Sequence, residues 1–248
     1  MEGILYGIGT GPGDPELMTL KAVKTANGSD VIVLPISDQS ILDQPVYFQG
    51  LTEEARKLNA GCIAYQIAEP NLEDLENKGF LYLPMPMIKD KEVLKSMHDA
   101  GLDAVLQLMK EGKKLAFLTL GDPTIYSTYL YIHNRVVKNN GRAEIINGIP
   151  SFCATAARLN MGLVENKDQL HVVPASYGVE EALSLSGAKV FMKAGKKMST
   201  VKKEVKKSGQ KLWMVENCAM KNERVYVDVD DVPEQSSYYS LLIVKEEK

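Results

Sequence analysis

Residues 121–128 are Gly121-Asp122-Pro123-Thr124-Ile125-Tyr126-Ser127-Thr128, and they follow a short apolar run at residues 115–120. An apolar run of this length, closed by a turn signal, is typical of a buried strand. Gly121 tolerates positive φ and lets a ligand approach the backbone, while Asp122 brings an acceptor to the strand end. In open α/β sheets, ligands bind at the carboxyl ends of strands. The octet therefore indicates either a ligand-binding turn or a strand-to-helix turn with an aspartate cap.

The composition is that of an ordinary globular protein. The chain has 248 residues, enough for one large domain or two modest ones, with 45% hydrophobic and 25% charged residues. A formal net charge of −3 argues against a general nucleic-acid binder. No apolar run approaches the length of a membrane span, and the first residues do not resemble a signal peptide. We therefore expect a cytoplasmic protein that binds neither nucleic acid nor membranes.

The cysteines and histidines do not indicate a metal centre. Cys62, Cys153 and Cys218 are far apart and lack CxxC spacing, which disfavours both a disulfide framework and a zinc site. Free thiols fit a reducing compartment. The histidines are isolated from one another, and His171 lies in an apolar run that is typical of a packed strand. We expect no metal ligands in this chain.

The first half of the chain alternates strands and helices. Strands are expected at residues 4–8, 30–34, 81–83, 115–120 and 143–146. Helices are expected at residues 17–26, 97–109 and 129–137, and a more polar excursion at residues 36–62 is expected to hold one helix at 52–58. This alternation predicts a mostly parallel sheet with flanking helices, in a domain spanning residues 1–148.

The second half has more strands and fewer helices. Strands are expected at residues 170–173, 189–193, 211–216, 224–229 and 238–244. Helices are expected at residues 152–159, 179–185 and 198–207, the first of them with Ser151 as its N-cap. The sequence thus predicts an α/β protein of two domains, the second spanning residues 149–248 with a mixed sheet. The active site is expected in the cleft between the domains.

The loops that follow the strands suit a ligand without phosphates. Residues 9–14 (GTGPGD) follow the first strand but match neither the Rossmann fingerprint nor a phosphate loop. Asp14 would repel a pyrophosphate and would tolerate a cationic ligand. Other strand-end loops are rich in Gly, Ala, Met and hydroxyls and lack a catalytic triad or a histidine base. This composition suits a purine nucleoside and a thioether, whose own reactivity would supply the chemistry.

Three stretches carry a resemblance to a known family. In order and spacing, the chain resembles the signatures of the tetrapyrrole methylases at residues 9–19 (GTGPGDPELMT), 120–123 (LGDP) and 147–151 (NGIPS). The resemblance covers essentially the whole chain. It implies S-adenosylmethionine as the cofactor, two α/β domains with the cofactor folded between them, and a homodimer. Two departures are Asn147, where Pro is usual, and Cys218, where many relatives have Gly.

A narrower resemblance concerns the reaction. The octet, residues 84–91 (PMPMIKDK) and residues 238–244 (YYSLLIV) are similar to stretches of the precorrin-2 C20-methyltransferases. This resemblance implies methylation of C20 of precorrin-2 or cobalt-factor II in cobalamin biosynthesis. The alternatives are a tetrapyrrole methylase acting at another ring position, an rRNA-modifying methylase of the same fold, and a nucleoside-binding module without turnover.

The family resemblance also implies roles for individual residues. The expected cofactor-binding residues are Gly11, Pro12, Leu120, Gly121, Asp122, Ile125, Ser127, Thr128, Ser151, Met192, Ala219 and Met220. Tyr126 is a candidate catalytic group near the substrate, and packing under the loop is its alternative role. Lys89 and Lys193 are candidate partners for substrate carboxylates. The expected nucleophile is the electron-rich C20 carbon, so the enzyme would mainly supply proximity and orientation, without a strong protein base.

Overall fold

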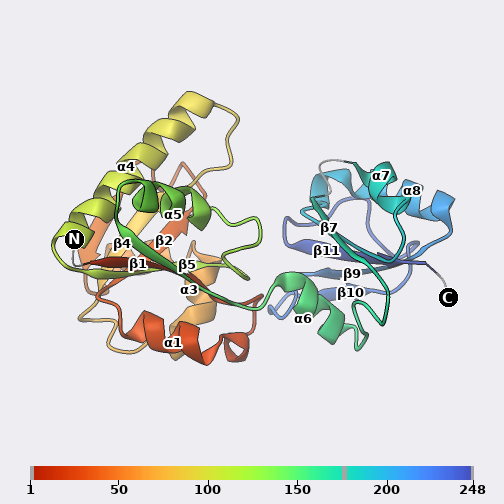
Figure 1. The fold of residues 1–248 in the computed structure, drawn as a ribbon, viewed down its shortest axis with the longest axis horizontal. Coiled ribbons are helices and arrows are strands. Elements are labelled where there is room, and N and C mark those ends of the chain that lie inside the picture. Colours follow the sequence, from red (N-terminus) through yellow and green to blue (C-terminus); the bar gives the residue numbers. More distant parts are fainter. Residues whose placement is uncertain (1–2, 175–177, 247–248) are drawn as a thin grey trace. The chain divides into compact units, whose positions relative to one another are not determined.

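The computed structural model describes residues 3–174 and 178–246. The chain divides into two compact units, Met1–Ile149 and Pro150–Lys248, which we call unit 1 and unit 2. Each unit has its own sheet and its own flanking helices, and each is described by itself (Figure 1). The prediction of an α/β protein with a mostly parallel and a mixed sheet is confirmed.

Unit 1 is built on a six-stranded sheet with the order β3-β4-β2-β5-β1-β6. Every neighbouring pair is parallel except β3 and β4, which are antiparallel. The central parallel strands β1, β2, β4 and β5 are buried on both faces, as their nearly continuous apolar sequences require, whereas the edge strand β6 is partly exposed. The strands are β1 (Ile4–Gly9), β2 (Val31–Ile36), β3 (Val46–Gln49), β4 (Gly79–Pro84), β5 (Lys114–Thr119) and β6 (Arg142–Ile146).

Helices cover both faces of this sheet. The helices α1 (Leu20–Asn27), α2 (Glu53–Asn59) and α3 (Ile63–Ala68) contribute Ala22, Ala55 and Tyr65 to one apolar cluster. The helices α4 (Lys91–Lys110) and α5 (Tyr129–Lys138) contribute Val105 and Ile132 to a second cluster on the other face. Figure 1 shows α4 and α5 on one side of the sheet and α1 on the other. Short 3-10 helices occur at Pro15–Leu17 and Glu69–Asn71.

The segment 36–62 is more regular than its sequence suggests. The expected helix is present as α2, but the edge strand β3 and the following helix α3 were not predicted. The strand β3 has only four residues and buries every second side chain partly, so its apolar signal is weak. Phe48 makes an edge-to-face contact with Tyr82, with ring centroids 6.0 Å apart, and this contact packs the strand against the apolar core.

Unit 2 has a five-stranded sheet with the order β10-β9-β11-β8-β7, in which only β7 and β8 are parallel. Its strands are β7 (Leu170–Pro174), β8 (Ala188–Met192), β9 (Lys211–Glu216), β10 (Arg224–Tyr226) and β11 (Ser240–Lys245). Its helices are α6 (Ser151–Arg158), α7 (Val179–Leu183) and α8 (Met198–Ser208), with a 3-10 turn at Gly195–Lys197. The helices α7 and α8 pack on one face of the sheet around Phe191 and Met214, and α6 contacts β11 (Figure 1).

Several expected boundaries in unit 2 are wrong. Ser151 is not an N-cap, because α6 begins at Ser151 and Pro150 is the capping residue, with no side-chain hydrogen bond to the helix end. Pro150 has an extended backbone, with φ −61° and ψ 142°, and the helix therefore begins at Ser151, one residue earlier than expected. The strand expected at 224–229 ends at Tyr226, and the one expected at 238–244 begins at Ser240.

Substituting Gly7 by Ala should destabilise unit 1. A Cβ at Gly7 would overlap the ring of Tyr129, which is fully buried and donates from its hydroxyl to the Glu144 carbonyl at 3.1 Å. We expect the free energy of unfolding to fall by about 2–3 kcal/mol, measured by urea denaturation. Gly61→Ala is the control, since its Cβ would approach only the Leu58 carbonyl, at 3.4 Å. Equal stability of the two variants would contradict this packing.

Candidate cofactor-binding site

Three loops meet at one edge of the sheet in unit 1. They follow the carboxyl ends of β1, β5 and β6, and β1 lies between the other two strands. Gly11 and Gly121 pair their backbones, with the Gly11 N–H donating to Gly121 at 3.2 Å and the Gly121 N–H donating to Gly11 at 2.8 Å. We call the loops 9–14, 120–128 and 147–149 the glycine rim. The edge occupied by the rim is where parallel α/β sheets bind their ligands.

The loops of the glycine rim touch backbone to backbone. A Cβ at Gly9 would lie 2.5 Å from the Gly148 nitrogen and 2.6 Å from the Gly121 oxygen. A Cβ at Gly148 would overlap that same Gly121 oxygen. Because any side chain at these positions would force the loops apart, glycine is required for the close approach.

Asp122 ties two of these loops together. Its side chain accepts hydrogen bonds at Oδ1 from the Thr124 N–H, at 2.8 Å, and from the Thr124 hydroxyl. At Oδ2 it accepts from Asn147 Nδ2 at 3.1 Å and from the Gly148 N–H at 3.0 Å. The residue is 5% exposed. These four bonds use the favourable acceptor positions of both oxygens, so the carboxylate fixes the third loop against the second.

The charge on Asp122 is retained despite burial. Burial pushes the pKa of the Asp122 carboxyl upward, but the hydrogen bonds from Thr124, Asn147 and Gly148 outweigh it and hold the pKa below its ordinary value. The rim is therefore built on an ionised carboxylate at neutral pH. A fixed negative charge at this place favours a cationic ligand.

Hydroxyl side chains join the loops of the glycine rim to the end of β5. The Thr10 hydroxyl donates to the Thr119 carbonyl at 3.2 Å, and the hydroxyls of Thr119 and Ser127 lie 2.9 Å apart. The Tyr129 N–H donates to the Ser127 oxygen at 3.2 Å, which satisfies one of the free donors at the start of α5. Ser127 thus has a structural part in the loop in addition to any contact with a ligand.

Gly121 combines a positive φ with uncrowded space at the position of a Cβ. Gly121 has φ +71° and Gly11 has φ +77°, which side-chain-bearing residues rarely adopt. A Cβ at Gly121 would meet nothing closer than the Ile149 oxygen, at 4.0 Å, so the space beside it is open. At position 121, glycine is favoured by the positive φ, and we call the unfilled space beside it the open cradle. At position 148, glycine is required because the loops pack too closely for a side chain.

In unit 2, a second set of loops follows β8 and β9. The Ala219 N–H donates to Glu223 Oε2 at 2.7 Å, and the other oxygen of Glu223 accepts from Arg158 at the end of α6. Asn217 and Ala219 have φ values of 52° and 61°. Cys218 between them is buried and does not have a positive φ, so it adds no backbone strain of this kind to the loop.

Backbone strain is concentrated on the loops that the sequence singled out. Among the described non-glycine residues with positive φ, only Tyr126, Lys193 and Ala219 are neither Asn nor Asp. Asn and Asp enter this region easily, whereas other residues do so at a cost of about 1–3 kcal/mol, usually near functional sites. All three strained residues lie on loops that follow β5, β8 and β9, and the side chain of Tyr126 is 48% exposed.

The structure places the expected site residues in two groups. Gly11, Pro12 and the residues from Leu120 to Thr128 lie on the glycine rim, while Ser151, Met192, Ala219 and Met220 lie on α6, at the end of β8 and after β9. Lys89 is exposed and follows β4, which β2 and β5 separate from β1. Gly9, Asn147 and Gly148 also form the rim and are not among the site residues predicted from the sequence. The sequence feature that could have indicated them is the recurrence of glycine in successive loops at strand ends.

A hollow lies on unit 2, away from the glycine rim. It has a volume of about 610 Å³ and is lined by residues that include Asn160, Trp213 and Lys245 of unit 2. These residues lie near the end of β11 and the start of β9, at the sheet edge opposite the loops that carry Met192 and Ala219.

Within residues 3–174 and 178–246, no cluster of three His, Cys, Asp or Glu side chains could hold a metal ion. No helix in the described part of the chain has the length and apolar character to span a membrane.

The comparisons place this fold in a known class. The family model of the Tetrapyrrole (Corrin/Porphyrin) Methylases matches residues 4–232 of this two-unit α/β protein. The chain belongs to the tetrapyrrole methylase family. These methyltransferases use S-adenosylmethionine, as the resemblance in the sequence implied.

Individual relatives agree with the family assignment. The chain is 32% identical to a probable cobalt-precorrin-2 C(20)-methyltransferase of Methanocaldococcus jannaschii, over 97% of this chain and 95% of that protein. It is 29% identical to a precorrin-2 C(20)-methyltransferase of Sinorhizobium sp, over 98% and 95%. The structure of uroporphyrin-III C-methyl transferase from Thermus thermophilus complexed with S-adenyl homocysteine has the same fold. Its TM-score is 0.65 at 17% identity, with 98% of each chain covered.

Replacing Asp122 should produce a pH-dependent loss of stability. Because the pKa of Asp122 is lower in the folded protein than in the unfolded chain, its contribution is complete above about pH 4 and is lost as the pH falls through the lowered value. At pH 7, Asp122→Asn should lower the free energy of unfolding by about 1–3 kcal/mol. The difference from wild type should shrink near pH 3, measured by urea denaturation. A difference that is constant with pH would contradict the role of the charge.

Gly121→Ala should weaken binding of the cofactor. The added methyl group fills the open cradle and strains the backbone at φ +71°. We expect the dissociation constant of S-adenosylhomocysteine, measured by calorimetry, to rise at least about tenfold. Gly112→Ala is the matched control, because Gly112 has a similar φ of +83°, has open space around it and lies outside the rim. Equal losses of affinity in both variants would show that strain alone is responsible.

Proposed function

We propose that this enzyme transfers a methyl group from S-adenosylmethionine to C20 of precorrin-2 or of its cobalt-containing form, in cobalamin biosynthesis. Three relatives that match nearly the whole chain are named as C(20)-methyltransferases, which supports the choice among ring positions. The structural observation that carries the proposal is the open cradle at Gly121 above the ionised Asp122. A cradle of this kind suits a ligand with a positive charge and no phosphate.

The rim residues hold and orient the donor. Bound S-adenosylmethionine supplies an electrophilic methyl group on a sulfonium sulfur. Gly11, Leu120 and Gly121 present backbone groups to the cofactor, and Pro12 and Ile125 present apolar surface. Asp122 keeps the loops in register, because its hydrogen bonds to Asn147 and Gly148 fix their separation. The protein thereby supplies proximity and orientation, which are worth many orders of magnitude when geometry is well held.

The substrate brings the nucleophile. The C20 carbon is activated by the pyrrole nitrogens beside it, so the protein need not remove a proton to start the reaction. Tyr126 is the rim residue that we place near the substrate, since its side chain is 48% exposed and its backbone is strained at φ 49°. The strain is explained if the loop holds this ring toward a ligand.

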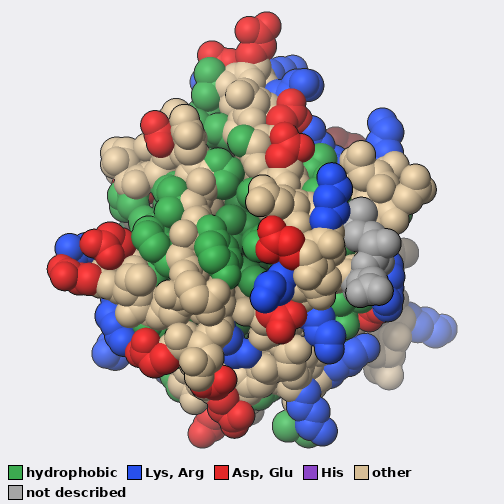
Figure 2. Space-filling model, turned by 90° about the vertical axis from the view of Figure 1, so that its left-hand side faces the viewer, with side chains coloured by type: hydrophobic (Ala, Val, Ile, Leu, Met, Phe, Trp, Pro, Cys, Tyr) green, Lys and Arg blue, Asp and Glu red, His purple; other side chains and the backbone are tan. Residues whose placement is uncertain are grey.

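We also propose that the enzyme is a cytoplasmic homodimer. The three cysteines are free, which suits a reducing compartment. Large apolar side chains are exposed on unit 1, among them Leu20, Met87 and Tyr131. Figure 2 shows hydrophobic side chains gathered in the middle of the face it presents, with charged side chains around them. Contiguous apolar surface of this kind supports contact with a second copy.

Methyl transfer tests the proposed function directly. The protein is incubated with S-adenosylmethionine carrying a labelled methyl group, once with metal-free precorrin-2 and once with cobalt-factor II. We expect label in one of the two tetrapyrroles, located at C20 by mass spectrometry and NMR, and loss of transfer in Asp122→Ala because the rim is no longer held. Label at another ring carbon, or no label in either compound, would refute the assignment, and full activity of Asp122→Ala would refute the site.

A further inference from the structure

Lys193 occupies an unusual position at the end of β8. It has φ 58°, and its ammonium lies 5.5 Å from the centre of the Tyr238 ring. A lysine in the left-handed region is uncommon, because its Cβ crowds the backbone there and glycine or asparagine would be more stable. The sequence therefore keeps a lysine where the backbone does not favour one, and this supports a use for its side chain.

The segment that carries Tyr238 is held firmly. The Ser237 N–H donates to Glu216 Oε1 at 2.7 Å, and the Tyr239 carbonyl accepts from the Asn217 N–H at 3.0 Å. The backbone of Gly195 packs closely against the same segment, since a Cβ at Gly195 would lie 2.7 Å from the Ser236 oxygen. The loops after β8 and β9 thus fix the position of the Tyr238 ring. A ring held in this way is a preorganised support for the Lys193 ammonium.

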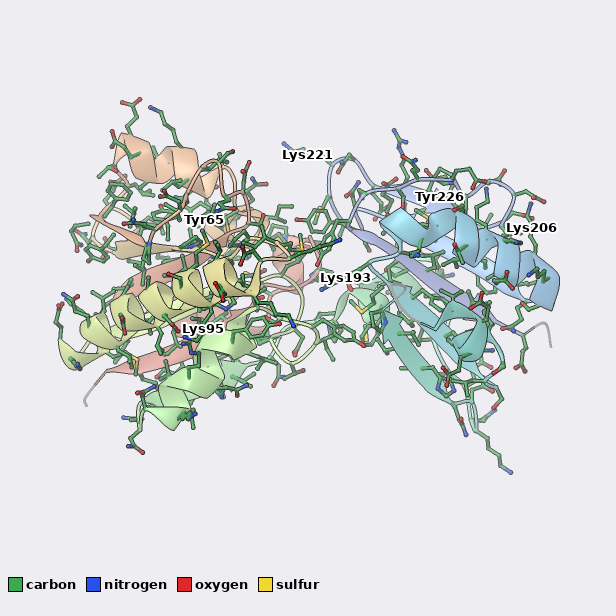
Figure 3. The ribbon with its side chains drawn as sticks, turned by 90° about the horizontal axis from the view of Figure 1, so that it is seen from above. Tyr65, Lys95, Lys193, Lys206, Lys221 and Tyr226 are labelled. Atoms are coloured by element: carbon green, nitrogen blue, oxygen red, sulfur yellow. The ribbon has the colours of Figure 1, made fainter. Side chains whose placement is uncertain are left out.

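The acidic residues beside Lys193 have partners within unit 2. Glu216 is 8% exposed and accepts from Ser237, and Glu223 accepts from Arg158 and from the Ala219 N–H. Figure 3 shows Lys193 and Lys221 at the same end of unit 2, with Lys206 at the opposite end. Two ammonium groups, those of Lys193 and Lys221, thus belong to this end of unit 2.

Two exposed aromatic rings stand beside the charge. Tyr238 and Tyr239 are 42% and 37% exposed, and their rings meet edge to face with centroids 5.4 Å apart. An ammonium next to exposed aromatic surface suits a ligand that combines a carboxylate with a flat conjugated ring. The ammonium pairs with the carboxylate, and the tyrosine rings pack on the conjugated ring.

We propose that Lys193, supported by Tyr238, binds a carboxylate side chain of the tetrapyrrole substrate and so helps to orient the macrocycle. This inference rests on the proposed function for the identity of the ligand. In this role Lys193 is a substrate-binding residue, and the cofactor is bound without its help. Its loss should weaken binding of the tetrapyrrole and leave binding of the donor unchanged.

Three variants separate charge from shape. Lys193→Met keeps the length of the side chain and removes its charge, and Lys193→Arg keeps the charge. Lys206→Met is the control, because Lys206 is an exposed lysine of α8 that pairs with the surface carboxylate of Asp230. For each variant, KM and kcat with the tetrapyrrole are measured, together with calorimetric binding of S-adenosylhomocysteine and of uroporphyrin, a stable polycarboxylate tetrapyrrole.

We expect KM for the tetrapyrrole and the dissociation constant of uroporphyrin to rise about tenfold in Lys193→Met, the effect of losing one charge-assisted contact. Lys193→Arg should recover most of the loss, Lys206→Met should match wild type, and S-adenosylhomocysteine should bind all forms equally. Unchanged KM and uroporphyrin binding in Lys193→Met would overturn the inference, as would an equal loss in Lys206→Met or a parallel loss of S-adenosylhomocysteine binding. If the wild type transfers no methyl group, the proposed function fails, and uroporphyrin binding still decides the role of Lys193.

Discussion

The hydrogen bonds between the Asp122 carboxylate and the loop at Asn147 and Gly148 are the constraint on which the site depends. Three loops approach so closely that glycine is required where they touch, and such contact gives no side-chain packing to hold them. A buried carboxylate that accepts four hydrogen bonds supplies the missing attraction. Removing it would leave buried N–H donors without partners, which costs more than the net gain of the bonds themselves.

This arrangement joins stability to function. The bonds that hold the pKa of Asp122 low also keep it ionised, so the group that fixes the loops also places a negative charge at the rim, where we propose that the sulfonium donor binds. Asn147 contributes to the same network through its side-chain amide, and its carbonyl accepts from the Thr19 hydroxyl. The reaction needs a donor held in one orientation, and a rigid rim provides this with few chemically active side chains.

The strands that frame the site could be predicted from sequence, whereas their contacts could not. The apolar run at residues 115–120 corresponds to β5 (Lys114–Thr119), because a short buried strand has an unmistakable composition. The edge strand β3 was not predicted, since it is short and half exposed. The prediction that Ser151 is an N-cap is wrong, because the preceding Pro150 is the N-cap and Ser151 is already the first residue of the helix. The motifs lie on the loops that meet at the glycine rim in the folded sheet. They did not predict that Asp122 faces the loop at Asn147, because that depends on the order β5-β1-β6 in the folded sheet.

A crystal structure of the protein with S-adenosylhomocysteine tests the central claim most directly. The account predicts that the ligand lies against the backbone at Gly121, while Asp122 keeps its hydrogen bonds to Asn147 and Gly148. A ligand bound in the hollow beside Trp213 and Lys245, or a carboxylate of Asp122 turned from Gly148 to bond the ligand itself, would contradict it.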